Sequence, residues 1–149
     1  MTQPCIIMKI LESIFNAIVK HSQAELPNEA CGYLAEKNEI VSKYYALTNT
    51  DKAVDHFTMD PKEQFAAIKD MRECGATLCA VYHSHPETPA RPSAEDICLA
   101  FDPNISYVII SLADSEKTVV KSFRINKGIV DAEEIEIATE PGYKTEVPT

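Results

Sequence analysis

Two histidines separated by one residue are the first feature of the sequence that could do chemistry. His83 and His85 follow the apolar run TLCAVY (77–82), and a proline-rich stretch then leads to Ser93 and Asp96. If the apolar run is a strand, residues two apart project from the same face, so both imidazoles point one way. Since imidazole is the commonest metal ligand in proteins, this spacing predicts two ligands for one cation at a strand end.

Asp96 could complete the ligand set. It lies on the first turn of a helix predicted to begin at Ser93, where its carboxylate can swing toward the imidazoles. Two nitrogens and one oxygen, with one position left for water, are the ligands of a catalytic zinc rather than a structural one. Ser93 could then donate a hydrogen bond to the oxyanion of a tetrahedral intermediate. A serine and an aspartate three residues apart at a helix start can also be a simple capping pair, and that alternative stays open.

A general base is the remaining requirement of such a site. Catalytic zinc lowers the pKa of water and polarises a carbonyl, and a basic side chain must then take the proton of the water. Among the 23 acidic residues, two are placed for this role: Glu29, in PNEACGYL at the start of a predicted strand, and Glu87, next to the histidines. The residue types alone do not choose between them.

The elements that would position these residues follow one another as helix, strands, helix, strand, helix, strands. Apolar residues at helical spacing predict a first helix across 10–19, and an N-cap at Asp60 with a stop at Gly75 predicts a second. The other predicted elements are a helix from Ser93 to about Phe101, strands at 31–36, 40–47, 77–82, 106–112 and 118–125, and an edge strand at 134–137. This order predicts an α/β fold, a single-domain mixed β-sheet packed by helices.

Composition restricts the partners of the protein. Acidic residues outnumber basic ones by 23 to 14 in 149 residues, giving a net charge of -9, so we expect neither a nucleic-acid nor a membrane partner. No signal-peptide pattern and no run of eighteen apolar residues occurs, which predicts a cytoplasmic protein. The expected organisation is one domain over 1–138, followed by an acidic C-terminal tail over 139–149. The sequence does not indicate an oligomeric state.

The run from His83 to Asp96 resembles the signature of the JAMM metalloproteases, also called the MPN+ domain family. That signature is an upstream Glu, then H-S/T-H, seven residues, S, two residues and D, and this sequence matches each position with its spacing. The segments HFTMDP (56–61) and YVIIS (107–111) are also similar to those of the small bacterial members. The resemblance therefore covers roughly residues 8–137.

Membership of this family would give each motif residue a role. The resemblance implies zinc ligation by His83, His85 and Asp96, general-base catalysis by Glu29, and stabilisation of the oxyanion by Ser93. Ser84 has a place in the family pattern, and we expect its role to be structural. The implied fold is the cytidine-deaminase-like α/β sandwich of the family, with one zinc ion per chain.

The same resemblance implies a class of substrate. Members hydrolyse peptide or isopeptide bonds at the carboxyl end of ubiquitin or ubiquitin-like β-grasp proteins, and small prokaryotic members are associated with sulfur-carrier proteins. Ubiquitin-specific members carry insertions that grip their substrate, whereas here only seven residues separate His85 from Ser93 and fewer than sixty follow Asp96. The expected partner is therefore the C-terminal tail of a ubiquitin-like sulfur-carrier protein.

Several other classes of protein compete with this interpretation. One is a metal-free scaffold or binding module of the same fold, and another is a cysteine hydrolase that pairs Cys31 or Cys79 with a histidine. A zinc nucleoside deaminase would need H-x-E and P-C-x-x-C, and neither occurs. A metallo-β-lactamase would continue as H-x-H-x-D-H, where this sequence has PET (86–88), and an amidohydrolase needs a larger barrel.

Overall fold

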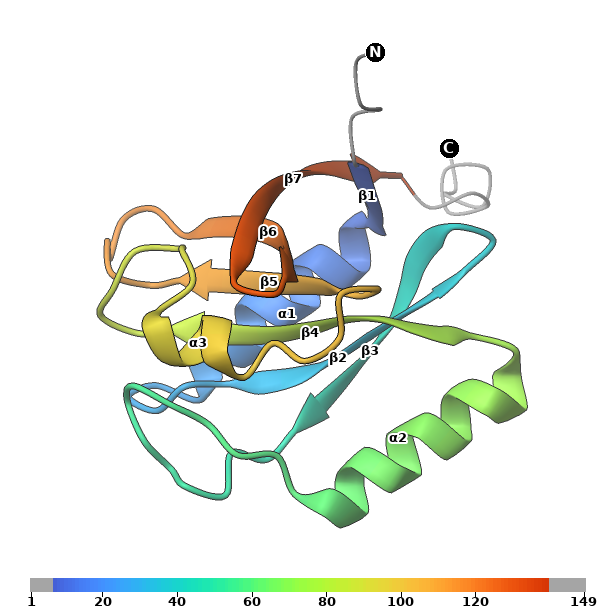
Figure 1. Cartoon of the computed structure of the whole chain (residues 1–149), viewed down its shortest axis with the longest axis horizontal. Helices are drawn as coiled ribbons and strands as arrows, with labels where there is room; N and C mark the ends of the chain where they lie inside the picture. The colour runs from blue at the N-terminus through green and yellow to red at the C-terminus, as the bar shows by residue number, and fades with distance from the viewer. Residues whose placement is uncertain (1–6, 140–149) are drawn as a thin grey trace, which may run out of the picture.

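One mixed β-sheet organises the computed structural model, which describes residues 7–139. Its elements in chain order are β1 (Ile7–Leu11), α1 (Glu12–Ala24), β2 (Cys31–Lys37), β3 (Ile40–Leu47), α2 (Pro61–Cys74), β4 (Thr77–His85), α3 (Ala94–Cys98), β5 (Ser106–Ser111), β6 (Val119–Asn126) and β7 (Ile129–Ala138). The α/β class with a mixed sheet packed by helices is thereby confirmed. Figure 1 shows β2, β4 and β5 crossing the middle of the molecule.

The strands lie in the order β1-β3-β2-β4-β5-β6-β7, and β7 pairs in parallel with β1, so the sheet closes on itself. β4 lies between β2, to which it is antiparallel, and β5, to which it is parallel. The central strand therefore has a strand on each side from Ala80 to His83. Its C-terminal end, where His83 and His85 lie, is paired with β5 as far as His85.

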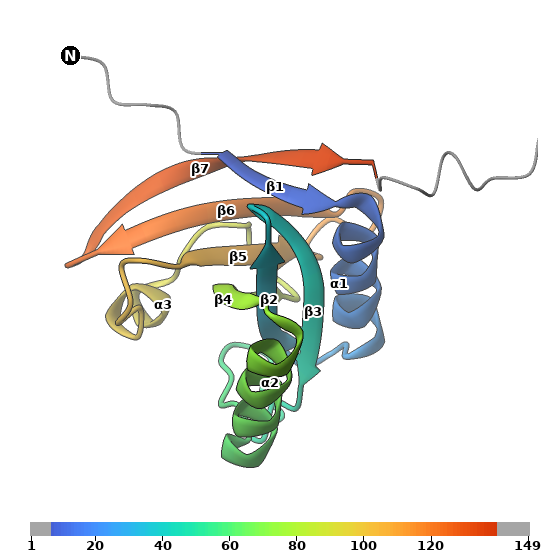
Figure 2. The ribbon, with the colours of Figure 1, turned by 90° about the vertical axis from the view of Figure 1, so that its right-hand side faces the viewer.

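The helices cover opposite faces of the sheet because side chains alternate along each strand. On one face, Leu34, Tyr82 and Val108 form a core with Ile18 of α1. On the other face, residues of β2 and β4 pack against α2, and residues of β5 and β6 pack against α3. Figure 2 shows α1 and α2 on opposite sides of β2 and β3. Both histidines project from the α2 and α3 face.

Helix α2 begins and ends where its sequence predicts. The Asp60 side chain accepts a hydrogen bond from the Lys62 amide at 2.9 Å, and Pro61 takes the first helical position. Gly75 ends the helix with a φ of 74°, a left-handed conformation that glycine adopts without steric cost. Local chemistry is thus sufficient to predict both ends of this helix.

The first helix was predicted to start too early. Residues 10 and 11 belong to β1, and α1 begins at Glu12 without a side-chain cap. Ile10 is opposite Ile137 of β7 and Val41 of β3, so burial between two strands overrides the helical spacing of the apolar residues. The expected helix after Ser93 also ends sooner, at Cys98 rather than at Phe101, which is 81% exposed.

The prediction of an edge strand at 134–137 is wrong in two respects. β7 is ten residues long, and it is paired on both sides, with β6 in a hairpin and with β1 in parallel. The hairpin turns at Lys127 and Gly128, both with positive φ, as a two-residue turn requires. Pairing with a strand at the opposite end of the chain leaves no local signal in the sequence.

The domain expected over 1–138 stays a prediction, and residues 1–6 of it lie outside the described residues. The acidic tail expected at 139–149 lies, apart from Thr139, outside the described residues. Within residues 7–139, no helix is both long enough and apolar enough to cross a membrane.

Candidate active site

The two histidines lie at the C-terminal end of β4, and both are buried. His83 and His85 are each 4% exposed, and their Nε2 atoms lie 3.1 Å apart. The Ser84 side chain points to the opposite face, as strand geometry predicts, and its Oγ accepts a hydrogen bond from the Ala30 amide at 2.7 Å. The Ser84 amide donates to the Ala30 carbonyl at 3.0 Å. Ser84 thus ties the end of β4 to the segment before β2, which fits the structural role expected of it.

Asp96 reaches the histidines from the first turn of α3. Its Oδ2 lies 3.2 Å from Nε2 of His83 and 3.1 Å from Nε2 of His85. The same oxygen accepts the Ser93 amide at 2.9 Å, while the Asp96 amide donates to Ser93 Oγ at 3.0 Å, which is a complete capping box. Capping and cluster formation are therefore not alternatives, because one carboxylate does both.

Hydrogen bonds within this cluster decide its protonation. Burial alone would raise the pKa of Asp96, but hydrogen bonds from both histidines outweigh burial and hold that pKa well below its usual range. Burial lowers the pKa of His85, yet its bonds to Asp96 and to the Pro89 carbonyl outweigh this and raise it. Nδ1 of His85 must be the donor to the Pro89 oxygen at 2.8 Å, so its Nε2 can donate to Asp96 only when the ring is protonated. The neutral ring instead offers an Nε2 lone pair to a metal ion.

These three side chains suit a metal ion. Their candidate ligand atoms all lie within 4.8 Å of one another, and the three closest atoms are 3.1–3.2 Å apart. Tetrahedral zinc with bonds of about 2.0–2.1 Å separates neighbouring ligand atoms by roughly 3.3 Å. The donor set and its spacing therefore fit a cation, which would take the place of the proton that the cluster otherwise shares.

Glu29 lies beside this cluster, two residues before β2. Cys31 pairs with His83, and extending that register by two residues places Glu29 opposite His85. Glu29 is 4% exposed, and its Oε1 is buried without a hydrogen-bond partner among the described residues. Burial raises the pKa of Glu29 to about 8; the charge of His85 opposes this rise, and the charge of Asp96 adds to it. The alternative base, Glu87, is exposed on the loop after β4.

A cavity of about 320 Å³ opens next to the cluster. His83 and Asp96 line it, together with aromatic and aliphatic side chains of β2, β4, β5 and β6. Phe57 packs on the His83 ring with centroids 4.9 Å apart, and both Phe57 and His56 also line the cavity. Sequence reasoning assigned no role to either residue, although both belong to the HFTMDP segment that carried part of the family resemblance.

Comparison with known proteins decides the family. The model of the prokaryotic homologs of the JAB domain matches residues 11–126. The chain belongs to this family. A CysO-cysteine peptidase from Mycobacterium tuberculosis is 31% identical over 133 residues, which are 88% of this chain and 91% of the relative. A desampylase from Haloferax volcanii is 28% identical over 103 residues, 67% of this chain and 74% of the relative.

Solved structures agree with this membership. The solution structure of protein DSY2949 from Desulfitobacterium hafniense has a TM-score of 0.83 and 46% identity, covering 93% of this chain and 97% of that one. Another solved structure is described as JAMM, a metalloprotease-like zinc site in the proteasome and signalosome. Its TM-score is 0.55 at 18% identity, and the match covers 87% of this chain and 98% of that one. That likeness shows the fold, and the resemblance of this prokaryotic JAB protein to the JAMM family is confirmed.

The cysteine-hydrolase alternative fits the structure poorly. Burial raises the pKa of the Cys31 and Cys79 thiols to about 12, so neither is a thiolate near neutral pH. Both thiols donate to main-chain carbonyls, Cys31 to Leu47 at 3.7 Å and Cys79 to Leu34 at 3.4 Å. A nucleophilic cysteine needs the opposite environment, one that stabilises its anion.

Proposed function

We propose that this prokaryotic JAB protein is a zinc-dependent peptidase that hydrolyses the bond after the C-terminal Gly-Gly of a ubiquitin-like sulfur-carrier protein. The observation that supports this most is that two imidazole nitrogens and one carboxylate oxygen lie 3.1–3.2 Å from one another beside the buried Glu29. The relatives named as a CysO-cysteine peptidase and a desampylase support a hydrolase of this class.

His83, His85 and Asp96 would hold the zinc ion. When bound, zinc would act as a Lewis acid on the substrate carbonyl and lower the pKa of water at the site toward about 7. The chain itself orients the ligands: the Pro89 carbonyl fixes the His85 ring, and the Ser93 amide fixes the Asp96 carboxylate. Partners of this kind set the tautomer and direction of metal ligands.

Glu29 is the proposed general base. Its Oε1, which is buried without a partner, can take a proton from the attacking water and return it to the leaving nitrogen. A pKa of about 8 places the carboxyl close to the working pH, where a single group can both accept and release a proton. The exposed Glu87 has neither the burial nor the position for this exchange.

Ser93 is the proposed donor to the oxyanion. Its Oγ accepts the Asp96 amide, which leaves the hydroxyl proton to point toward the developing negative charge on the substrate oxygen. Because Ser93 caps α3, its position is fixed by the same bonds that hold Asp96. A fixed donor costs no reorganisation when the charge develops.

The cavity beside the cluster is the proposed place for the carrier tail. Its apolar walls include Tyr33, Phe57 and Ile109, and the exposed Leu99 and Phe101 stand at its side. A glycine-rich tail is narrow enough to lie extended in such a groove. The carrier body would then contact the exposed apolar residues beyond α3.

Intact-mass spectrometry tests this function. A bacterial sulfur-carrier protein with extra residues after its terminal Gly-Gly is incubated with the zinc-loaded protein, with and without a chelator. We expect a loss of mass corresponding to cleavage after the second glycine, which the chelator abolishes and added zinc restores. Cleavage that persists in the chelator, or no cleavage by protein with one bound zinc per chain, would contradict the proposal.

A further inference from the structure

We propose that Asn49 is a positioning residue for Glu29. Its side-chain amide locks the loop 49–58 against the main chain of Glu29, and so fixes the carboxylate beside the histidines. This inference rests on the proposed function, because it takes Glu29 to be the general base. Asn49 lies just after β3, outside the JAMM signature, and its side chain bonds to none of the three candidate metal ligands.

The Asn49 side chain is buried and uses all its hydrogen-bonding capacity. Its Nδ2 donates to the main-chain carbonyls of Glu29 at 3.1 Å and His56 at 3.0 Å. Its Oδ1 accepts from the main-chain amides of Asp51 at 3.1 Å and Thr58 at 3.2 Å. One amide therefore joins both arms of the loop to the segment that carries Glu29. Within residues 7–139, no other side-chain amide makes four hydrogen bonds to the main chain.

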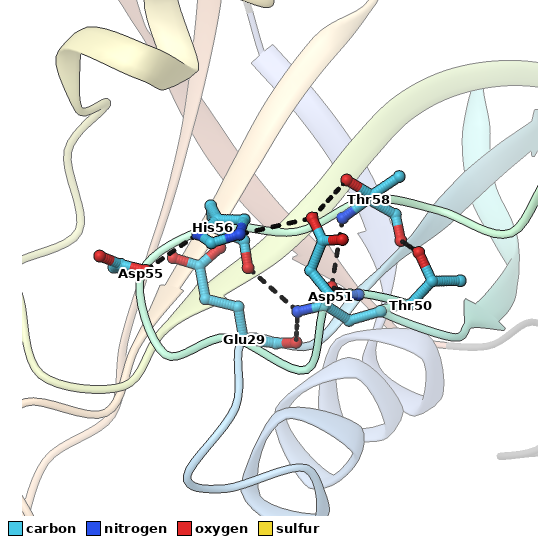
Figure 3. Close-up of polar contacts among 7 residues, drawn as sticks. Glu29, Thr50, Asp51, Asp55, His56 and Thr58 are labelled. Atoms are coloured by element: carbon cyan, nitrogen blue, oxygen red, sulfur yellow. Dashed lines mark hydrogen bonds and ion pairs between the residues drawn. The ribbon is translucent and has the colours of Figure 1, made fainter.

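The main chain of Glu29 is held on both sides. Its carbonyl accepts from Asn49, and its amide donates to the Ala53 carbonyl of the same loop at 2.8 Å. The next residue, Ala30, is bonded in turn to Ser84 at the end of β4. Figure 3 shows Glu29 against the loop, with a dashed line that ends on its main-chain carbonyl oxygen. The loop and β4 thus clamp the short segment from which the Glu29 side chain extends.

Other bonds close the loop without touching Glu29. Thr58 Oγ1 donates to Asp51 Oδ2 at 2.6 Å, and both the amide and the hydroxyl of Thr50 donate to the Thr58 carbonyl, at 2.9 and 3.1 Å (Figure 3). Thr50 is exposed, whereas Asn49 is 4% exposed. Removing the Thr50 hydroxyl therefore perturbs the same loop and leaves the clamp on Glu29 intact, which makes Thr50→Val a matched control.

Glu29 needs such a clamp because its carboxylate is not held at Oε1. That oxygen is buried without a partner among the described residues, so its position follows from the main chain. A partner there would compete with the proton that a general base must take up. Since a displacement of about 1 Å can cost on the order of 100-fold in rate, loosening the main chain should slow turnover without weakening substrate binding.

A double-mutant cycle tests the inference on the zinc-loaded full chain, with the extended sulfur-carrier protein as substrate. Asn49→Ala should lower kcat by on the order of 10-fold or more, with KM and zinc content unchanged. In the Glu29→Gln background the same substitution should change kcat by less than about twofold, because the group being positioned is already absent. Thr50→Val should match the wild type.

Hydrogen exchange gives a second measurement that does not depend on turnover. In the metal-free protein, Asn49→Ala should speed exchange of the Glu29 amide by on the order of 10-fold or more, whereas Thr50→Val should not. Asn49→Ser, whose hydroxyl keeps one donor and one acceptor, replaces Asn49→Ala if that variant does not fold.

Several results would overturn the positioning role. They are an unchanged Glu29 exchange rate, an equal kcat loss in both backgrounds of the cycle, and an equal loss in Thr50→Val. Failure of the proposed function has a different signature: the zinc-loaded wild type would not cleave the extended carrier. Failure of the base role alone would show as turnover retained in Glu29→Gln. A normal kcat for Asn49→Ala beside an inactive Glu29→Gln would remove the role of Asn49 and leave that of Glu29.

Discussion

The fold buries two glutamates in very different surroundings. Glu133 on β7 is 6% exposed and accepts hydrogen bonds from the hydroxyls of Ser106 at 2.6 Å and Ser122 at 2.7 Å, and from Nε of Arg124 at 3.3 Å. Glu29 is buried as deeply, yet its Oε1 has no partner among the described residues and its pKa is raised to about 8. Both oxygens of Glu133 accept hydrogen bonds, whereas Oε1 of Glu29 accepts none from residues 7–139.

This difference separates a structural carboxylate from a candidate catalytic one. A buried charge stabilises a fold only when it is paired and hydrogen-bonded, which is the case for Glu133. An unpartnered buried carboxyl group costs stability, and such groups gather at functional sites. Burial alone would therefore make both residues candidates for a catalytic carboxylate. The absence of a hydrogen-bond donor to Oε1 within the described part of the chain favours Glu29.

The largest effect is expected from a third carboxylate, that of Asp96. Unlike either glutamate, it shares its oxygen with two histidines, so Asp96→Ala should lose the metal and lower turnover by on the order of 1,000-fold or more. Metal content by mass spectrometry and turnover of the extended carrier would be measured together. Ser93→Ala removes the cap hydroxyl but keeps all three ligands, and should retain the metal. Full metal occupancy in Asp96→Ala would show that the ligands are wrong.

The next effect is a pH dependence that Glu29 gives to the metal-free protein. Its pKa rises from 4.5 to about 8 on folding because of burial. Between these values the folded state binds a proton that the unfolded state has released, so stability falls as pH rises through this window and levels above it. Urea unfolding in chelator would measure the free energy of unfolding at pH 5 and at pH 9. This free energy should fall between the two pH values, and the fall should be smaller in Glu29→Gln than in the wild type by on the order of 3 kcal/mol. Equal falls in both proteins would contradict the raised pKa.

Replacing Glu133, whose carboxylate is fully hydrogen-bonded, should lower stability and leave catalysis unchanged. Glu133→Gln cannot accept from two hydroxyls and Arg124 as the carboxylate does, so it should lower the free energy of unfolding by on the order of 2 kcal/mol. Urea unfolding would measure this loss, and kcat and zinc content should equal those of the wild type. A loss of kcat at unchanged zinc content would contradict the purely structural role of Glu133.

The smallest effect is expected at one of the partners of Glu133. Ser122→Ala removes a single donor and leaves the other two in place, so the free energy of unfolding should fall by about 1 kcal/mol. Thermal unfolding would detect this, with Thr50→Val as a surface hydroxyl control. A loss as large as that of Glu133→Gln would mean that the carboxylate is held mainly by Ser122.

Much of the site could be predicted because its residues follow local rules. Strand alternation places His83 and His85 on one face, and a capping pair places Asp96 on the first turn of α3. Position alone left Glu29 and Glu87 as candidates for the base, and the family resemblance favoured Glu29. Burial and the register of β2 with β4 now support that choice.

What the sequence did not reveal depends on contacts between distant segments. The start of α1 was misplaced because Ile10 is buried between β3 and β7, and the two-sided pairing of β7 needs a strand from the other end of the chain. Asn49 gave no signal either, since an asparagine after a strand is usually a turn residue. Its role becomes visible only when its four hydrogen bonds are placed.

The most direct test of the account compares the two buried glutamates in one assay. Glu29→Gln and Glu133→Gln are loaded with zinc, their metal content is measured, and turnover of the extended sulfur-carrier protein is followed beside the wild type. We expect Glu29→Gln to keep one zinc per chain and to lose turnover by on the order of 100-fold or more. Glu133→Gln should keep both zinc and turnover. Full activity in Glu29→Gln, or an equal loss in both variants, would contradict the assignment of Glu29 as the general base.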